Sequence, residues 1–157
     1  MSVEVSQALL CLQRRDDAAD ERVRRSLEVL REAGHVDQFD HARLEYALLT
    51  NDPAVLRWAI EGLSESLVSV CVASARLARL EGQPLDVANL EATLEAALAA
   101  ENFAELPLGY ELLAHELETR GDAFQAARMR ERARSVNLEC AAGLPKLQRT
   151  AFLQLEA

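Results

Sequence analysis

The stretch from Leu56 to Leu80 constrains the fold most, because its apolar residues keep a seven-residue rhythm longer than any other in the chain. These residues step by four and three, and only Ser74 interrupts the stripe. Residues 66–75 carry no charge, so side chains on nearly every face of this stretch have little reason to contact water. The pattern predicts a buried central helix. Its stripe consists of Leu56, Ile60, Leu63, Leu67, Val70 and Leu77.

The sequence of this stretch favours a helix over a strand or a membrane span. Its valines alternate with small residues as they would in a strand, but the helical rhythm extends on both sides and no other segment resembles a partner strand. A membrane span needs roughly 20 apolar residues, about twice the length of the uncharged run. We therefore expect an internal helix. Gly62 and Ser64 leave open whether residues 53–81 form one helix or two.

Composition favours a single all-α domain over residues 1–157. The chain is 50% hydrophobic and 27% charged, which is ordinary for a globular domain with a core. Alanine, leucine, glutamate and arginine dominate, and only 4% of the residues are aromatic, as is typical of helical proteins.

Glycine, proline and aspartate predict where the helices begin and end. Asp37 and Asp52 are placed as N-caps, Pro53 suits a first helical position, and Gly34 suits a helix end. About eight helices are expected. With their flanking residues they cover 3 to 14, Asp17 to Gly34, Asp37 to Asn51, Asp52 to Gly82, Leu85 to Glu101, Pro107 to Gly121, Asp122 to Gly143, and the chain from Pro145 onward.

Three turns share a pattern that predicts helical hairpins in series. Gly34, Gly82 and Gly121 each follow one helix and precede another. The positions eleven, eight, seven and four residues before each glycine hold small or apolar side chains, although any amphipathic helix that ends in glycine would show part of this pattern. These positions are Val23, Ser26, Leu27, Leu30, Cys71, Ser74, Ala75, Ala78, Tyr110, Leu113, Ala114 and Leu117.

The third hairpin resembles the tetratricopeptide repeat over residues 107–136. The matching residues are Tyr110, Leu113, Ala114, Leu117, Gly121, Asp122, Ala126 and Ala133. The resemblance implies a curved stack of hairpins whose inner surface binds a peptide or protein; an irregular helical bundle is the alternative. The chain departs from the family at Leu138, where a proline is usual, and in its glycine spacings of 48 and 39 residues. Glu111 and His115 replace the family's carboxylate-binding lysine and asparagine.

Net charge and cysteine content indicate which classes of partner and which cellular location to expect. A net charge of −9 disfavours nucleic acid and anionic membranes. Cys11, Cys71 and Cys140 are odd in number and lie on apolar faces, which predicts buried free thiols in a reducing cytoplasm. The N-terminal apolar run is short and lacks a cleavage-like site, so no export signal is expected. Lys146 is the only lysine, and this arginine bias suggests a GC-rich bacterial genome.

No catalytic or metal-binding motif is complete. His115 and Glu116 begin a zinc-protease motif, but Thr119 stands where the second histidine is required. Glu32 and His35 have the spacing of di-iron bundles but occur in a single copy. No phosphate loop, dinucleotide fingerprint or nucleophile elbow is present. We expect a protein that is not an enzyme and has no metal or cofactor.

The candidate binding residues are Glu111, His115 and Glu118, which share one side of the sixth expected helix. If that side lines a groove, it would bind a basic segment; a plain solvated face is the alternative. The alternating arginines at positions 128–134 fit either salt bridges within the chain or an acidic partner surface.

We therefore expect a protein-interaction or adaptor module that binds a protein or peptide partner. The sequence is also compatible with a homo-oligomer. The alternative is a helical regulatory domain that binds a small molecule or pairs with a transcription regulator. An enclosed pocket would favour the regulatory domain, whereas an open face would favour the adaptor.

Overall fold

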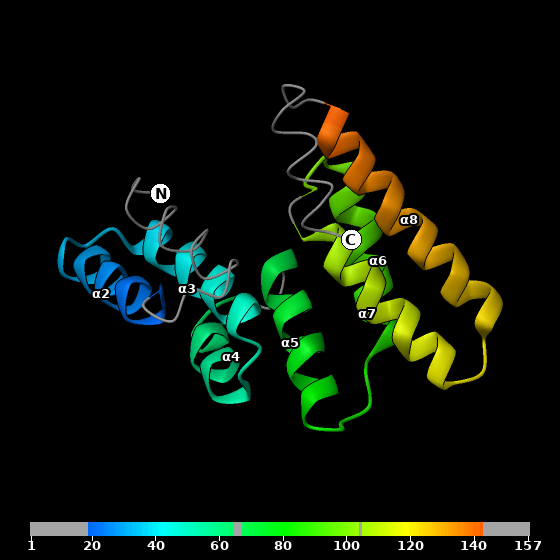
Figure 1. Ribbon diagram of the computed structural model, residues 1–157, viewed down its shortest axis with the longest axis horizontal. Coiled ribbons are helices and arrows are strands. Elements are labelled where there is room, and N and C mark those ends of the chain that lie inside the picture. The colour runs from blue at the N-terminus through cyan, green and yellow to red at the C-terminus, as the bar shows by residue number, and fades with distance from the viewer. Residues whose placement is uncertain (1–18, 65–66, 104, 143–157) are drawn as a thin grey trace. The chain divides into compact units, whose positions relative to one another are not determined.

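The computed structural model describes residues 19–64, 67–103 and 105–142. Within these ranges all regular secondary structure is helical, which confirms the all-α prediction (Figure 1). The helices expected at the two ends, Cys11 and the stop at Gly143 lie outside the described residues. The helices are α2 (Ala19–Glu32), α3 (Val36–Thr50), α4 (Pro53–Ile60), α5 (Val68–Leu80), α6 (Val87–Ala99), α7 (Leu106–Thr119) and α8 (Ala123–Ala142).

The chain divides into two compact units, residues 1–83 and 84–157. The first unit contains α2 to α5, and the second contains α6 to α8. The hairpins expected at Gly34 and Gly121 are present, because α2 packs on α3 and α7 packs on α8. The hairpin expected at Gly82 would join helices of different units, so it stays a prediction, as does the single domain.

The central stretch, for which the sequence left one helix or two open, forms two helices, α4 and α5. Gly62 adopts a left-handed conformation with φ +76°, which ends α4 and redirects the chain before α5 begins. Leu67 precedes α5 as its N-cap residue and is 47% exposed, so the expectation that it is buried was wrong. The seven-residue rhythm runs through the break because Ile60 and Leu63 pack against the same core from the end of α4 and the turn after it.

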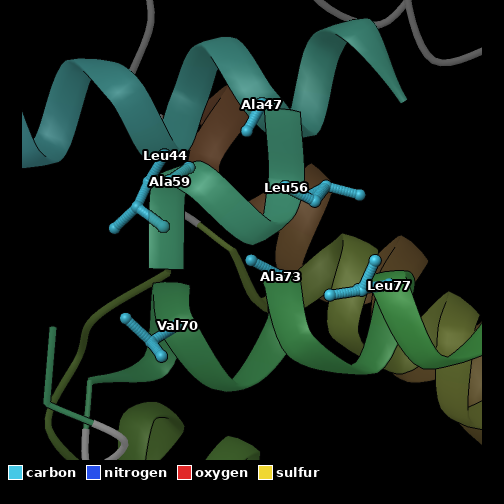
Figure 2. Packing of buried hydrophobic residues seen from close by; sticks show 7 residues of the cluster. All are labelled: Leu44, Ala47, Leu56, Ala59, Val70, Ala73 and Leu77. Atoms are coloured by element: carbon cyan, nitrogen blue, oxygen red, sulfur yellow. The ribbon is translucent and has the colours of Figure 1, made fainter. Parts of the chain in front are cut away.

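The core of this region joins three helices (Figure 2). Val70, on α5, is 3% exposed and faces apolar residues of α3 and α4. Alanines at the contacts let the helix backbones approach closely. The cluster consists of Leu44, Ala47, Leu56, Ala59, Val70, Ala73 and Leu77.

One of the two predicted N-caps is correct. The Asp52 side chain accepts a hydrogen bond of 2.7 Å from the backbone N–H of Ala54, and Pro53 begins α4. Asp37 does not cap α3. That helix begins at Val36, and Asp37 lies in its first turn, where a negative charge favours the helix dipole.

In the second unit, α7 packs against both α6 and α8. Gly109 lies in α7 where a Cβ atom would collide with the fully buried side chain of Leu94 on α6. Close packing of these two helices therefore depends on a residue without a side chain. At the other end of α7, Gly121 has φ +85° and begins the turn into α8.

Candidate functional site

A groove of about 500 Å³ lies within the first unit. Its walls come from α2 and α4, and its floor comes from α3, which packs on both of them. The lining mixes aliphatic, aromatic and charged side chains. These are Arg24, Leu27, Glu28, Arg31, Phe39, Tyr46, Asp52, Ala54, Val55 and Trp58.

Helical periodicity explains why these residues share the groove. The α2 wall uses positions 24, 27, 28 and 31, which fall on one face of a helix. The α3 floor uses Phe39 and Tyr46, which are two turns apart on the same face. Because α2 and α3 form a hairpin, the end of α2 lies beside the start of α3. The groove thus has a Phe39 end, with Arg31 and Trp58, and a Tyr46 end, with Arg24 and Asp52.

The Phe39 end is built around an aromatic pair. The rings of Phe39 and Trp58 meet edge to face, with 6.2 Å between their centroids and an interplanar angle of 82°. The Arg43 guanidinium lies 5.4 Å from the Phe39 centroid and 5.9 Å from the Trp58 centroid. Trp58 is still 39% exposed, so the pair offers apolar surface to the groove.

Arg43 fixes the α4 wall in place. Its side chain is only 11% exposed and forms an ion pair of 3.0 Å with Asp40. It also donates hydrogen bonds to the carbonyl oxygens of Trp58, at 3.3 Å, and Glu61, at 3.1 Å. These are carbonyls that the end of a helix leaves without partners. Arg43 therefore joins α3 to the C-terminal end of α4 and uses most of its own donors in doing so.

The charges at the Tyr46 end are also engaged. The Tyr46 hydroxyl donates a hydrogen bond of 2.5 Å to Asp20, and Arg24 donates one of 2.8 Å to the same carboxylate. Burial, followed by the Asp20 hydrogen bond, raises the pKa of Tyr46 to about 12, so Tyr46 is a neutral donor at physiological pH. Asp52 caps α4 with its carboxylate.

Two groove charges are left for a ligand. Glu28 and Arg31 are exposed, and neither forms an ion pair or a side-chain hydrogen bond within the described part of the chain. The groove therefore combines an apolar wall with one available carboxylate and one available guanidinium.

The site residues predicted from the sequence lie in the other unit. Glu111, His115 and Glu118 are all exposed on α7. Glu118 accepts a hydrogen bond of 2.5 Å from Arg130 on α8, and this bond lowers the pKa of Glu118. One of the three residues is therefore already paired within the chain.

The alternating arginines are mostly paired as well. Arg132 forms an ion pair with Glu95 of α6, and Arg134 lies 3.6 Å from Glu131 on its own helix. Arg128 donates a hydrogen bond of 3.0 Å to Gln125. With the Arg130 pair to Glu118, three of the four arginines form ion pairs within the chain, which supports the salt-bridge interpretation.

The described ranges also contain histidine, cysteine, aspartate and glutamate side chains, which are types that bind metals. No group of three or more histidine, cysteine, aspartate or glutamate side chains there could hold a metal ion. None of the described helices is both long and apolar enough to cross a membrane. Cys71 is buried and Cys140 half-buried, and both are free thiols.

Sequence reasoning missed the groove because it assigned Leu27 to an apolar packing face only, and because Phe39 and Tyr46 fit the apolar face of the third expected helix. The signal was present in α2, where Arg24, Glu28 and Arg31 repeat at helical spacing beside Leu27. Trp58, the single tryptophan, was a second signal. In comparisons with protein-family profiles, curated proteins and solved structures, none matched this chain.

Proposed function

We propose that this protein is a non-enzymatic interaction module, an adaptor whose α2–α3–α4 groove binds a short segment of a partner protein. The main support is the partly exposed Phe39–Trp58 pair in a groove that opens to solvent. Aromatic side chains are enriched at protein interfaces because they bury large areas at low entropic cost. The tetratricopeptide-like arrangement and a bacterial cytoplasmic location belong to the same proposal.

The size of the groove agrees with this role. A volume of about 500 Å³ is within the range of ligand sites and accommodates a few side chains rather than a whole domain. Phe39, Val55 and Trp58 provide the apolar contact, and Arg43 holds one wall in position before any ligand arrives. A regulatory domain for small molecules is the second candidate, supported by the same volume.

A groove-blocking variant tests the proposal. A display library of short random peptides is selected on the full chain, and synthetic copies of the enriched peptides are titrated. Ala54→Arg places a long side chain in the groove at an exposed helical position. We expect it to weaken binding by at least about 10-fold, equivalent to about 1.4 kcal/mol.

Ala92→Arg is the matched control, because Ala92 is an exposed helical alanine that lies outside the groove, on α6. It should leave the affinity unchanged. Equal binding by the Ala54→Arg chain, or no enriched peptide at all, would show that the groove does not bind peptides. A small molecule that binds the wild-type chain but not Ala54→Arg in a compound screen would favour the regulatory domain.

A basic partner on α7 remains a separate proposal. Glu111 and His115 are exposed, and the net charge of −9 attracts basic segments. Glu111→Gln should weaken a basic peptide more than Glu118→Gln, because the Glu118 charge is already partly neutralised by Arg130. Equal affinity of the Glu111→Gln chain and the wild type would mean that this face is only solvated.

A further inference from the structure

We propose that the groove recognises a partner segment in which a large apolar side chain stands next to a carboxylate. This inference rests on the proposed function and adds the chemistry of the occupant. The apolar side chain lies against Phe39 and Trp58, and the carboxylate binds the Arg31 guanidinium.

The distribution of engaged and available charges leads to this assignment. Of the two groove arginines, Arg24 is bound to Asp20, whereas Arg31 has no side-chain partner among the described residues. Arg31 lies in the last turn of α2, beside the Phe39 end. A guanidinium presents a planar fork of donors that matches the two oxygens of a carboxylate. The available cation and the exposed aromatic surface therefore lie at the same end of the groove.

The same end disfavours a cationic group. The Arg43 guanidinium already lies over both rings, so a partner lysine or arginine would approach a second positive charge to reach them. Glu28 lies three residues before Arg31, which is about one turn along α2 toward the Tyr46 end. Its negative charge repels a ligand carboxylate from the middle of the groove. The ligand is thereby oriented with its carboxylate at the Phe39 end.

Charge reversal at Arg31 provides the test. The displayed random library is selected in parallel on the wild-type chain, on Arg31→Glu and on Arg25→Glu. Arg25 lies on α2 but outside the groove, with its side chain 78% exposed, so Arg25→Glu changes the net charge equally. Wild type and Arg25→Glu should enrich peptides with a bulky apolar residue beside aspartate or glutamate. Arg31→Glu should lose these peptides and favour lysine or arginine at the same position.

Trp58 then gives a direct readout, because the fluorescence of the only tryptophan reports contact at the Phe39 end. The most enriched peptide is titrated beside its amide version, with glutamine or asparagine replacing the acidic residue. On the wild type we expect the amide version to bind about 10-fold more weakly, as for one charge-assisted hydrogen bond. On the Arg31→Glu chain the carboxylate should give no advantage.

The outcomes separate the two proposals. The inference is wrong if the enriched peptides lose affinity for Ala54→Arg but show no preference for an acidic residue. It is also wrong if they bind Arg31→Glu as well as wild type. In both cases the proposed adaptor groove is unaffected. An absence of enriched peptides overturns both. Sedimentation of the free chains tests whether a second copy of the chain occupies the groove. A dimer that Arg31→Glu dissociates would assign the groove to self-association and contradict binding of a partner segment.

Discussion

Four of the described helices end with the same backbone arrangement, and only one of them does so without glycine. After α7, Gly121 donates to the carbonyl of Glu118 and Asp122 to that of Leu117. This pair of bonds closes a helix through a left-handed residue. After α6, Glu101 takes the same position with φ +56°. A left-handed conformation costs an L-residue with a side chain roughly 1–2 kcal/mol.

Substitutions at Gly121 and Glu101 should therefore change the free energy of unfolding in opposite directions. Gly121→Val should lower the free energy of unfolding by about 1 kcal/mol or more, because a β-branched side chain is poorly tolerated at φ +85°. Glu101→Gly should raise it by up to about 1 kcal/mol by removing the strain. Urea denaturation of both variants measures the changes. A neutral Gly121→Val would show that the turn adopts another conformation in solution.

The two tyrosines provide a pH-dependent prediction. The folded pKa of Tyr46 is about 12, above the unfolded value of 10, so folding favours the neutral phenol. This contribution to stability is complete below pH 10 and is lost as the pH rises through about 12. Burial, with the Glu95 charge second, also raises the pKa of Tyr110.

Phenolate absorbance should consequently stay low at pH 10 in the folded chain, because Tyr46 and Tyr110 are its only tyrosines. Asp20→Asn should move the Tyr46 ionisation to lower pH, since the Asp20 charge and hydrogen bond both raise this pKa. Ionisation of both tyrosines near pH 10 in a chain shown to be folded by circular dichroism would contradict the structure.

At the scale of the helices, local signals predicted more than long-range periodicity did. The predicted stop at Gly34, cap at Asp52 and turn at Gly121 are confirmed, because each depends on one or two residues whose backbone preferences are strong. For the central stretch the sequence left one helix or two open, and only the burial predicted for Leu67 is wrong. A seven-residue rhythm does not distinguish one helix from two that pack on a common core, and Gly62 decided the outcome through its positive φ.

Leu67 and Val70 lie at the start of α5 but differ in burial, so substitutions at these two positions form a matched pair. Val70→Asp places a charge in the core and should destabilise the chain by several kcal/mol. Leu67→Asp should be tolerated, and should stabilise the helix by about 0.5–2 kcal/mol, because Leu67 is an exposed N-cap residue that offers no side-chain hydrogen bond. Thermal melting followed by circular dichroism compares the two. Equal destabilisation would mean that both positions are buried.

The candidate site was harder to predict than the fold, for a physical reason. A side chain such as Tyr46 satisfies the same apolar pattern whether it only packs or also lines a groove. Whether Arg24 and Arg31 are available depends on Asp20, which pairs with one and not with the other. That distinction requires side-chain geometry that spacing along the chain does not contain.

At the scale of the whole molecule, the prediction of a single domain can be tested with Val70→Asp. One cooperative domain requires that this change in the first unit also lower hydrogen-exchange protection in α6, α7 and α8. Exchange measured by mass spectrometry resolves the two units. Protected amides in α6 to α8 beside unprotected amides in α3 to α5 would show that the units unfold separately.

Within the groove, the residues that stabilise the fold differ from the residues that would contact a ligand. Leu27 and Tyr46 belong to the α2–α3 core cluster, together with Val23, and are nearly inaccessible. Glu28, Arg31 and Ala54 are exposed on the rim and outside that cluster. Substitution on the rim therefore carries little folding cost, whereas substitution of the floor does. A lineage could exchange one binding preference for another through a few rim mutations, with the helical scaffold inherited unchanged.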